Sequence, residues 1–138
     1  MYIRSTAVLA CSLMVSSCQF GVDVEVSGSA AAPVFTFGNM GWFGGDEPPI
    51  FDTLEVSENS TKGWPIAWQV DRHERGCRPA TSRVVYGRTP SGFLVSTKAS
   101  ALREGVTYEL FVNGCGRTGG ALFKVVNGQV ETVSRNGS

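Results

Sequence analysis

The sequence predicts an all-β protein, folded as a β-sandwich of two antiparallel sheets. Apolar residues alternate with polar ones along most of the chain, which is the period of a half-buried strand and not of a helix. Seventeen glycines and six prolines punctuate this alternation, and such residues end strands and form turns. Several short strands at this spacing favour a sandwich, with a small Greek-key barrel as the alternative architecture.

Four strands are expected in the first half of the domain, at residues 20–27, 33–37, 51–57 and 64–71. Three of them place apolar residues at every second position, and 33–37 is an apolar, β-prone stretch. The alternating residues are Phe20, Val22, Val24, Val26, Leu54, Val56, Ile66, Trp68 and Val70. A loop rich in glycine and proline, at 38–49, separates the second strand from the third.

Five more strands are expected in the second half, at 83–87, 92–97, 106–112, 121–126 and 129–133. The turn signal at 89–92 joins the first two of these strands, and a longer turn is expected over 113–120. Asn127-Gly128 joins the last two. This pair is the strongest short hairpin signal, because both residues tolerate a positive φ. We expect no helix longer than about one turn, near 99–103.

The segment from Leu102 to Tyr108 has the spacing L-x-x-G-x-x-Y, with Gly105 in the middle. It resembles the tyrosine corner of fibronectin type III and other immunoglobulin-like sandwiches. The resemblance covers about residues 33–126. It implies that Tyr108 buries its ring and bonds through its hydroxyl to nearby backbone, and that an earlier strand carries an inward tryptophan, which Trp68 fits. The strand order stays open.

The first seventeen residues have the pattern of a secretory signal peptide. Arg4 precedes an apolar run at 7–15, which is too short to span a bilayer, and small residues follow it. Val15-Ser16-Ser17-Cys18 resembles the lipobox of bacterial lipoproteins. That resemblance implies that Cys18 carries fatty acyl chains such as palmitate and begins a mature single domain at 18–138. Because Gln19 and not aspartate follows, it also implies the periplasmic face of the outer membrane.

The remaining cysteines fit an exported protein. Cys11 leaves with the signal peptide and Cys18 carries lipid, which leaves Cys77 and Cys115 as a pair. Two remaining cysteines in an exported chain predict one disulfide bond. The alternative is a metal site that includes His73, although one histidine and two distant cysteines lack the close spacing of structural zinc sites. We therefore expect no metal and no cofactor.

Charge and motifs exclude several classes of function. Without Arg4, one of the twelve basic residues, eleven remain against twelve acidic residues, so no net field favours nucleic acid. His73 lies in a charged segment without a recognisable nucleophile, and the adjacent Asp46 and Glu47 are weak candidates for a glycosidase pair. We expect no catalytic residues and no enzymatic activity.

Two surface features are candidates for binding. The first is a cluster of arginines, whose rigid guanidinium groups suit carboxylate and phosphate partners: Arg72, Arg75, Arg78, Arg83 and Arg88. The alternative is that these arginines pair internally with acidic residues such as Asp52. The second feature is Trp42-Phe43 in the 38–49 loop, because aromatic residues on loops often anchor partners. Alternatively, the two aromatic rings cap the end of the sandwich.

Together these features predict a lipid-anchored, non-catalytic binding module of the bacterial cell envelope. Its partner would be another envelope protein or peptidoglycan, and nothing in the sequence predicts its oligomeric state. One alternative is a periplasmic inhibitor or immunity lipoprotein that blocks a cell-wall hydrolase. The other is an enzyme that acts on the wall, for which His73 and Asp46 are the only residues to nominate.

Overall fold

The computed structural model describes residues 21–40, 48–60, 62–74 and 76–134, and the described chain is built from strands. The strands are β1 (Gly21–Ser27), β2 (Val34–Met40), β3 (Thr53–Glu58), β4 (Ile66–Arg72), β5 (Arg83–Val85), β6 (Phe93–Thr97), β7 (Thr107–Gly114), β8 (Arg117–Val126) and β9 (Gln129–Val133). The all-β prediction is confirmed. No helix in these residues is long and apolar enough to cross a membrane.

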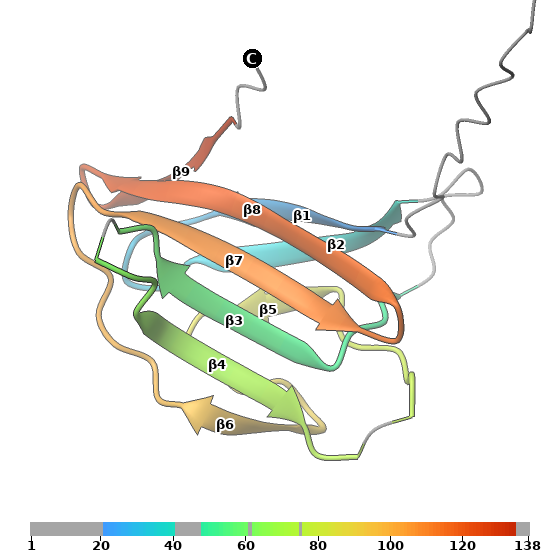
Figure 1. Ribbon diagram of the computed structural model, residues 1–138. Coiled ribbons are helices and arrows are strands. Elements are labelled where there is room, and N and C mark those ends of the chain that lie inside the picture. Colours follow the sequence, from blue (N-terminus) through green and yellow to red (C-terminus); the bar gives the residue numbers. More distant parts are fainter. Residues whose placement is uncertain (1–20, 41–47, 61, 75, 135–138) are drawn as a thin grey trace, which may run out of the picture.

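The strands form one curled, mixed sheet and not two separate antiparallel ones. Its order is β5-β2-β1-β8-β7-β3-β4-β6, with β9 paired to the far end of β8. Neighbouring strands are antiparallel except β1 and β8, which meet in parallel at Gly21 and Thr118 alone. Figure 1 shows the sheet curling so that β1, β2 and β5 lie behind β8, β7 and β3. The result is a half-barrel.

The expectation of two sheets fails at β8, because this strand belongs to both sides of the curl. Its residues 117–124 pair with β7, while its first part touches β1 and its last part pairs with β9. A glycine makes the junction with β1 possible. A Cβ atom on Gly119 would lie 2.2 Å from the carbonyl oxygen of Val22, so no larger residue fits there without a backbone shift.

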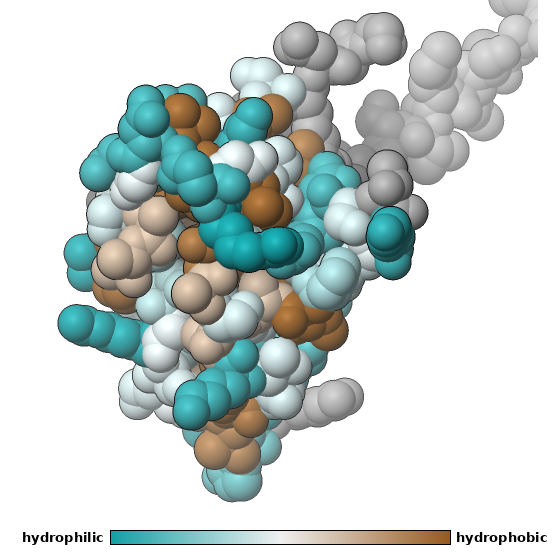
Figure 2. Space-filling view, turned by 90° about the vertical axis from the view of Figure 1, so that its left-hand side faces the viewer, coloured by the Kyte–Doolittle hydropathy of each residue, from teal (hydrophilic) through white to brown (hydrophobic). Residues whose placement is uncertain are grey.

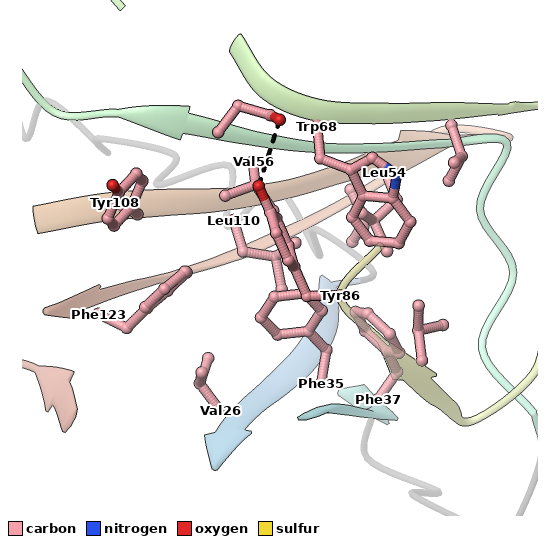
Figure 3. Packing of buried hydrophobic residues seen from close by; sticks show 14 of the residues in the cluster. Val26, Phe35, Phe37, Leu54, Val56, Trp68, Tyr86, Tyr108, Leu110 and Phe123 are labelled. Atoms are coloured by element: carbon pink, nitrogen blue, oxygen red, sulfur yellow. Dashed lines mark hydrogen bonds between the residues drawn. The ribbon is translucent and has the colours of Figure 1, made fainter. Parts of the chain in front are cut away.

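Aromatic side chains fill the space inside the curl and connect its two halves. Phe35 of β2 meets Phe123 of β8 with ring centroids 5.9 Å apart, and Tyr86, just after β5, meets Trp68 of β4 at 5.2 Å. Figure 3 shows Tyr86 in the middle of this core. Trp68 is 1% exposed, as the sequence predicted. Burial of the Tyr86 ring raises the pKa of its hydroxyl above the ordinary 10.0.

The tyrosine corner predicted at 102–108 is confirmed. Tyr108 is buried, and its hydroxyl accepts a hydrogen bond of 2.8 Å from the backbone N–H of Arg103. Gly105 between them has a φ of +77°, a conformation that glycine adopts without steric cost. The same loop holds the β8–β9 turn, since the Gly105 N–H donates to Val125 O and the Glu104 carboxylate accepts from the Gly128 N–H.

The hairpin at Asn127-Gly128 is also confirmed, with φ values of 51° and 73°. The longer turn expected over 113–120 is wrong in extent. There, β7 continues to Gly114 and β8 begins at Arg117. Only Cys115 and Gly116 remain between them, with φ values of 55° and 71°. Two residues with positive φ form the tight turn that suits the twist of a hairpin.

Candidate binding surfaces

The disulfide predicted between Cys77 and Cys115 is present, with Cα atoms 5.5 Å apart. It joins the loop after β4 to the tight turn between β7 and β8. Asp52, which precedes β3, lies at the same place, with its Oδ2 atom 3.6 Å from the Cys115 sulfur. We call this part of the molecule the disulfide end and the part around Tyr108 the corner end.

Arg72 is an internal residue at the disulfide end. Its side chain is 7% exposed and its Nε lies 3.2 Å from Asp52 Oδ1. Its Nη2 donates to the carbonyl oxygens of Phe51 and Arg78, and its guanidinium lies 4.8 Å from the centre of the Phe93 ring. These contacts match the alternative of internal pairing. Because of these contacts, little of the Arg72 guanidinium is accessible to a binding partner.

The other residues proposed from the sequence are dispersed. Arg78 is exposed and lies 3.6 Å from Glu74, while Arg83 lies on β5 and exposed Arg88 in the turn that follows it. His73 is exposed just after β4. The remaining proposed residues lie outside the described part of the chain: Cys18, Trp42, Phe43, Asp46, Glu47 and Arg75.

A polar hollow of about 300 Å³ opens at the disulfide end. It is lined by Asp52, Thr53, Asp71, Arg72, Asn113, Gly114 and Cys115. Asp71 accepts from Thr53 Oγ1 at 2.7 Å, from Gln69 Nε2 at 3.0 Å and from Ser96 Oγ. Every buried side-chain nitrogen and oxygen in the described residues has a partner. Asp52, Thr53, Asp71 and Arg72 thus bond to other groups of the chain, and these bonds stabilise this end of the sheet.

Exposed apolar side chains gather on one half of the sheet. The large hydrophobic residues with the greatest exposure are Trp64 52%, Ile66 42%, Leu94 56%, Val95 49% and Phe111 36%. All of them lie on β4, β6 or β7 or just before β4, and none of these five lies on β1, β2 or β5. A clustered apolar surface is more informative than single exposed residues. The half of the sheet with β7, β3, β4 and β6 is therefore the candidate binding surface.

The corner end, by contrast, is mixed in character. Figure 2 views it end-on and shows hydrophilic residues interleaved with separate hydrophobic spots. This pattern is ordinary for a protein surface. The outer face of β3 and β7 differs from the corner end, because its side chains line an open hollow.

This second hollow, of about 240 Å³, is lined by two carboxylates, two aromatic rings and one hydroxyl: Glu55, Ser57, Trp64, Glu109 and Phe111. We call it the acid–aromatic hollow. The sheet register explains it, because Glu55 pairs with Phe111 and Ser57 with Glu109 across β3 and β7. Outward side chains on paired strands stand beside one another. Trp64 comes from the residues before β4, where Ile66 pairs with Ser57.

The chemistry of the acid–aromatic hollow favours a cation. Glu55 and Glu109 are diagonal neighbours across β3 and β7, a relation that places Cβ atoms roughly 7 Å apart. Both carboxylates carry negative charge, so together they attract a positive group. The faces of tryptophan and phenylalanine rings also attract cations. No group of three or more metal-ligating side chains occurs in the described residues.

Comparisons with protein-family models, with curated proteins and with solved structures found no match.

The sequence reasoning missed the residues of the acid–aromatic hollow, although one signal was present. Phe111 lies out of phase with the inward residues Tyr108, Leu110 and Val112, so it is an apolar residue at a solvent-facing position of its strand. Leu94 stands in the same relation to Phe93 on β6. Large apolar residues at outward positions of a strand therefore marked this surface.

Proposed function

We propose that this protein is a lipid-anchored, non-catalytic binding module of the bacterial cell envelope, which contacts another envelope protein through the outer face of β3, β4 and β7. The exposed apolar side chains of Trp64, Ile66 and Phe111 on this face are the observation that carries the proposal. The acid–aromatic hollow supplies the specific contact. A basic side chain of the partner enters it, with its charge between Glu55 and Glu109 and its methylene groups against Trp64 and Phe111.

This pairing supplies both affinity and selectivity. Trp64 and Phe111 offer apolar area, which dominates the energy of most interfaces, and tryptophan is enriched among residues that contribute most. The two carboxylates attract a basic partner over distance and discriminate against an acidic one. Lipid at Cys18 confines the encounter to the membrane plane. Residues 38–40, expected in a loop, belong to β2, and Trp42 and Phe43 in the segment after β2 remain a predicted second contact.

The test is crosslinking of the full-length chain in native envelopes, followed by identification and quantification of the captured protein. Trp64→Ala is expected to reduce the capture of that protein by at least about tenfold, as truncating a central aromatic anchor usually does. Glu55→Gln is expected to reduce capture and to weaken its dependence on salt, because one charge of the contact is lost.

The matched control is Glu25→Gln, which makes the same charge change at an exposed position of β1, and it should capture as the natural chain does. Trp64→Phe, which keeps an aromatic ring, should recover part of the capture. Equal capture by the Trp64→Ala, Glu55→Gln and natural chains would show that this face is not the contact. In the same envelopes, Trp42→Ala tests the contact predicted for the segment after β2 independently.

The anchor has its own test. Cells fed a labelled fatty acid should label the natural chain, and the Cys18→Ser variant should stay unlabelled and leave the membrane fraction. One myristoyl-length chain binds membranes only marginally, whereas two or more chains hold a protein stably. Recovery of the natural chain without label, in the soluble fraction, would contradict the lipid anchor.

A further inference from the structure

The two edge strands of the sheet differ in how well they are protected from pairing with strands of other molecules. The order of strands leaves β5 at one edge and β6 at the other. β5 has three residues, whereas β6 has five, Phe93–Thr97, without charge or proline among them. Proteins usually protect sheet edges with short strands, charges or proline. Within its length β6 has neither charge nor proline, and its register shift lies beyond Val95.

The backbone of β6 is oriented for pairing. The His73 N–H donates to Gly92 O at 3.0 Å, and Leu94 pairs with Asp71 one step further. Because backbone groups of successive residues face opposite sides of a strand, the backbone of Leu94 faces β4. The N–H and C=O of Val95 and the C=O of Phe93 therefore face the open edge.

The β6 sequence is complementary to itself about Leu94. In an antiparallel pairing centred there, Leu94 faces Leu94 of the second copy, and Phe93 faces Val95. The basic residue nearest the strand, Lys98, falls opposite Pro90, so like charges do not meet. The register shift within the β4–β6 pair lies beyond Val95 and outside the centre of the contact.

We propose that two copies of this chain pair edge to edge through β6, antiparallel and two-fold symmetric about Leu94. Each Val95 N–H donates to the Phe93 C=O of the other copy. The contact covers Leu94 and Val95, which are 56% and 49% exposed in the single chain. It is an isologous contact, in which the same patch serves both copies. Because the contact involves neither Trp64 nor Glu55, it is independent of the acid–aromatic hollow.

Cysteine crosslinking of the full-length chain in bacterial envelopes tests the pairing. Residues opposite each other in a non-hydrogen-bonded pair have Cα atoms about 4.5 Å apart, within the range of a disulfide. Leu94→Cys should therefore form a covalent dimer on mild oxidation. Val95→Cys, nearly as exposed, faces Phe93 of the other copy and should form at least fivefold less dimer. The natural chain should form none.

Proline tests the backbone bond. Val95→Pro removes an N–H that faces the open edge, and proline is tolerated at such edge positions. Added to Leu94→Cys, it should abolish the crosslink, whereas Val95→Thr, which keeps the N–H and the branched shape, should preserve it. An intact Cys77–Cys115 bond and an unchanged melting temperature verify folding of each variant.

Three outcomes would overturn the pairing. They are absence of a dimer from the Leu94→Cys chain, equal or faster crosslinking at Val95→Cys, and crosslinking of Leu94→Cys to a different protein in place of a second copy.

Discussion

The two ends of the curled sheet are held by different chemistry. At the disulfide end, a covalent bond joins Cys77 to Cys115 and a nearly buried guanidinium binds Asp52 and two backbone carbonyls. At the corner end, hydrogen bonds hold the segments together, along with a partly exposed ion pair between Arg103 and Glu58. The hydroxyl of Tyr108 accepts from Arg103 N–H, and that of Tyr86 donates to Ala67 O or Ser100 O.

The difference follows from how many separate segments meet at each end. The disulfide end collects the residues before β3, the end of β4 with the loop that follows it, and the β7–β8 turn, so it must join three segments that are distant in sequence. The disulfide bond and the Arg72 guanidinium, which offers several hydrogen-bond donors, can hold several segments together. The corner end is built largely from one continuous segment, 102–108, on which the β8–β9 turn rests. Individual hydrogen bonds and the Arg103–Glu58 ion pair hold that segment in place.

The largest effect is expected from removing the disulfide. Replacing Cys77 and Cys115 together by serine releases a loop with a sequence separation of 38 residues, and loop-closure entropy then predicts a loss of about 4 kcal/mol of unfolding free energy. Urea titration of the natural and double-serine chains measures it. Hydrogen exchange should show faster opening at the disulfide end and unchanged protection at the Arg103 amide. An equal increase in hydrogen-exchange rates at both ends would mean that the two ends do not open independently.

The next effect concerns Arg72. Replacement by methionine keeps most of the volume but leaves Asp52, which is 21% exposed, without its cation, and leaves two carbonyls without this donor. Breaking one side of a buried ion pair costs about 3 kcal/mol, and the partial exposure of Asp52 places the expected loss near or below that figure. The double variant Arg72→Met with Asp52→Asn should recover part of it. If urea titration shows that the unfolding free energy falls by less than about 0.5 kcal/mol, this ion pair stabilises the fold no more than an ordinary surface pair does.

The difference between contacts within one segment and contacts between distant segments explains which parts could be predicted from the sequence. The corner is local, because Gly105 and Tyr108 stand at fixed offsets in one segment, and so is the Asn127-Gly128 hairpin. The Arg72–Asp52 pair and the acid–aromatic hollow depend on which strands become neighbours. Alternation tells which face a residue takes but not which strand lies beside it. The single curled sheet was missed for the same reason, since it depends on β8 touching β1 where Gly119 permits a close approach.

A smaller effect is expected at the corner. Tyr108→Phe keeps the buried ring, which stacks on Phe123 with centroids 5.6 Å apart, and removes only the acceptor for the Arg103 N–H. Loss of one such bond costs about 1 kcal/mol. Thermal unfolding should therefore show a modest decrease in stability, with exchange of the Arg103 amide accelerated more than that of amides at the disulfide end. An unchanged rate at Arg103 would show that this hydroxyl does not hold the corner.

The smallest effect is confined to alkaline pH and concerns the second tyrosine. Burial raises the pKa of Tyr86 above its ordinary value of 10.0, although the hydrogen bond to Ser100 lowers it in part. The folded protein therefore keeps this proton at a pH where the unfolded chain has lost it. Stability from this group is complete below pH 10 and is lost as the pH rises toward the folded-state pKa.

Urea titrations from pH 8 to pH 11 should show a decline in the natural chain that is smaller in Tyr86→Phe, which cannot ionise. Because Tyr86→Phe leaves every other ionisable group unchanged, the difference between the two slopes isolates Tyr86. Parallel slopes would mean that its hydroxyl is as accessible to water in the folded chain as in the unfolded one. That result would contradict the burial of Tyr86 against Trp68 and leave the corner end with Tyr108 as its principal tyrosine contact.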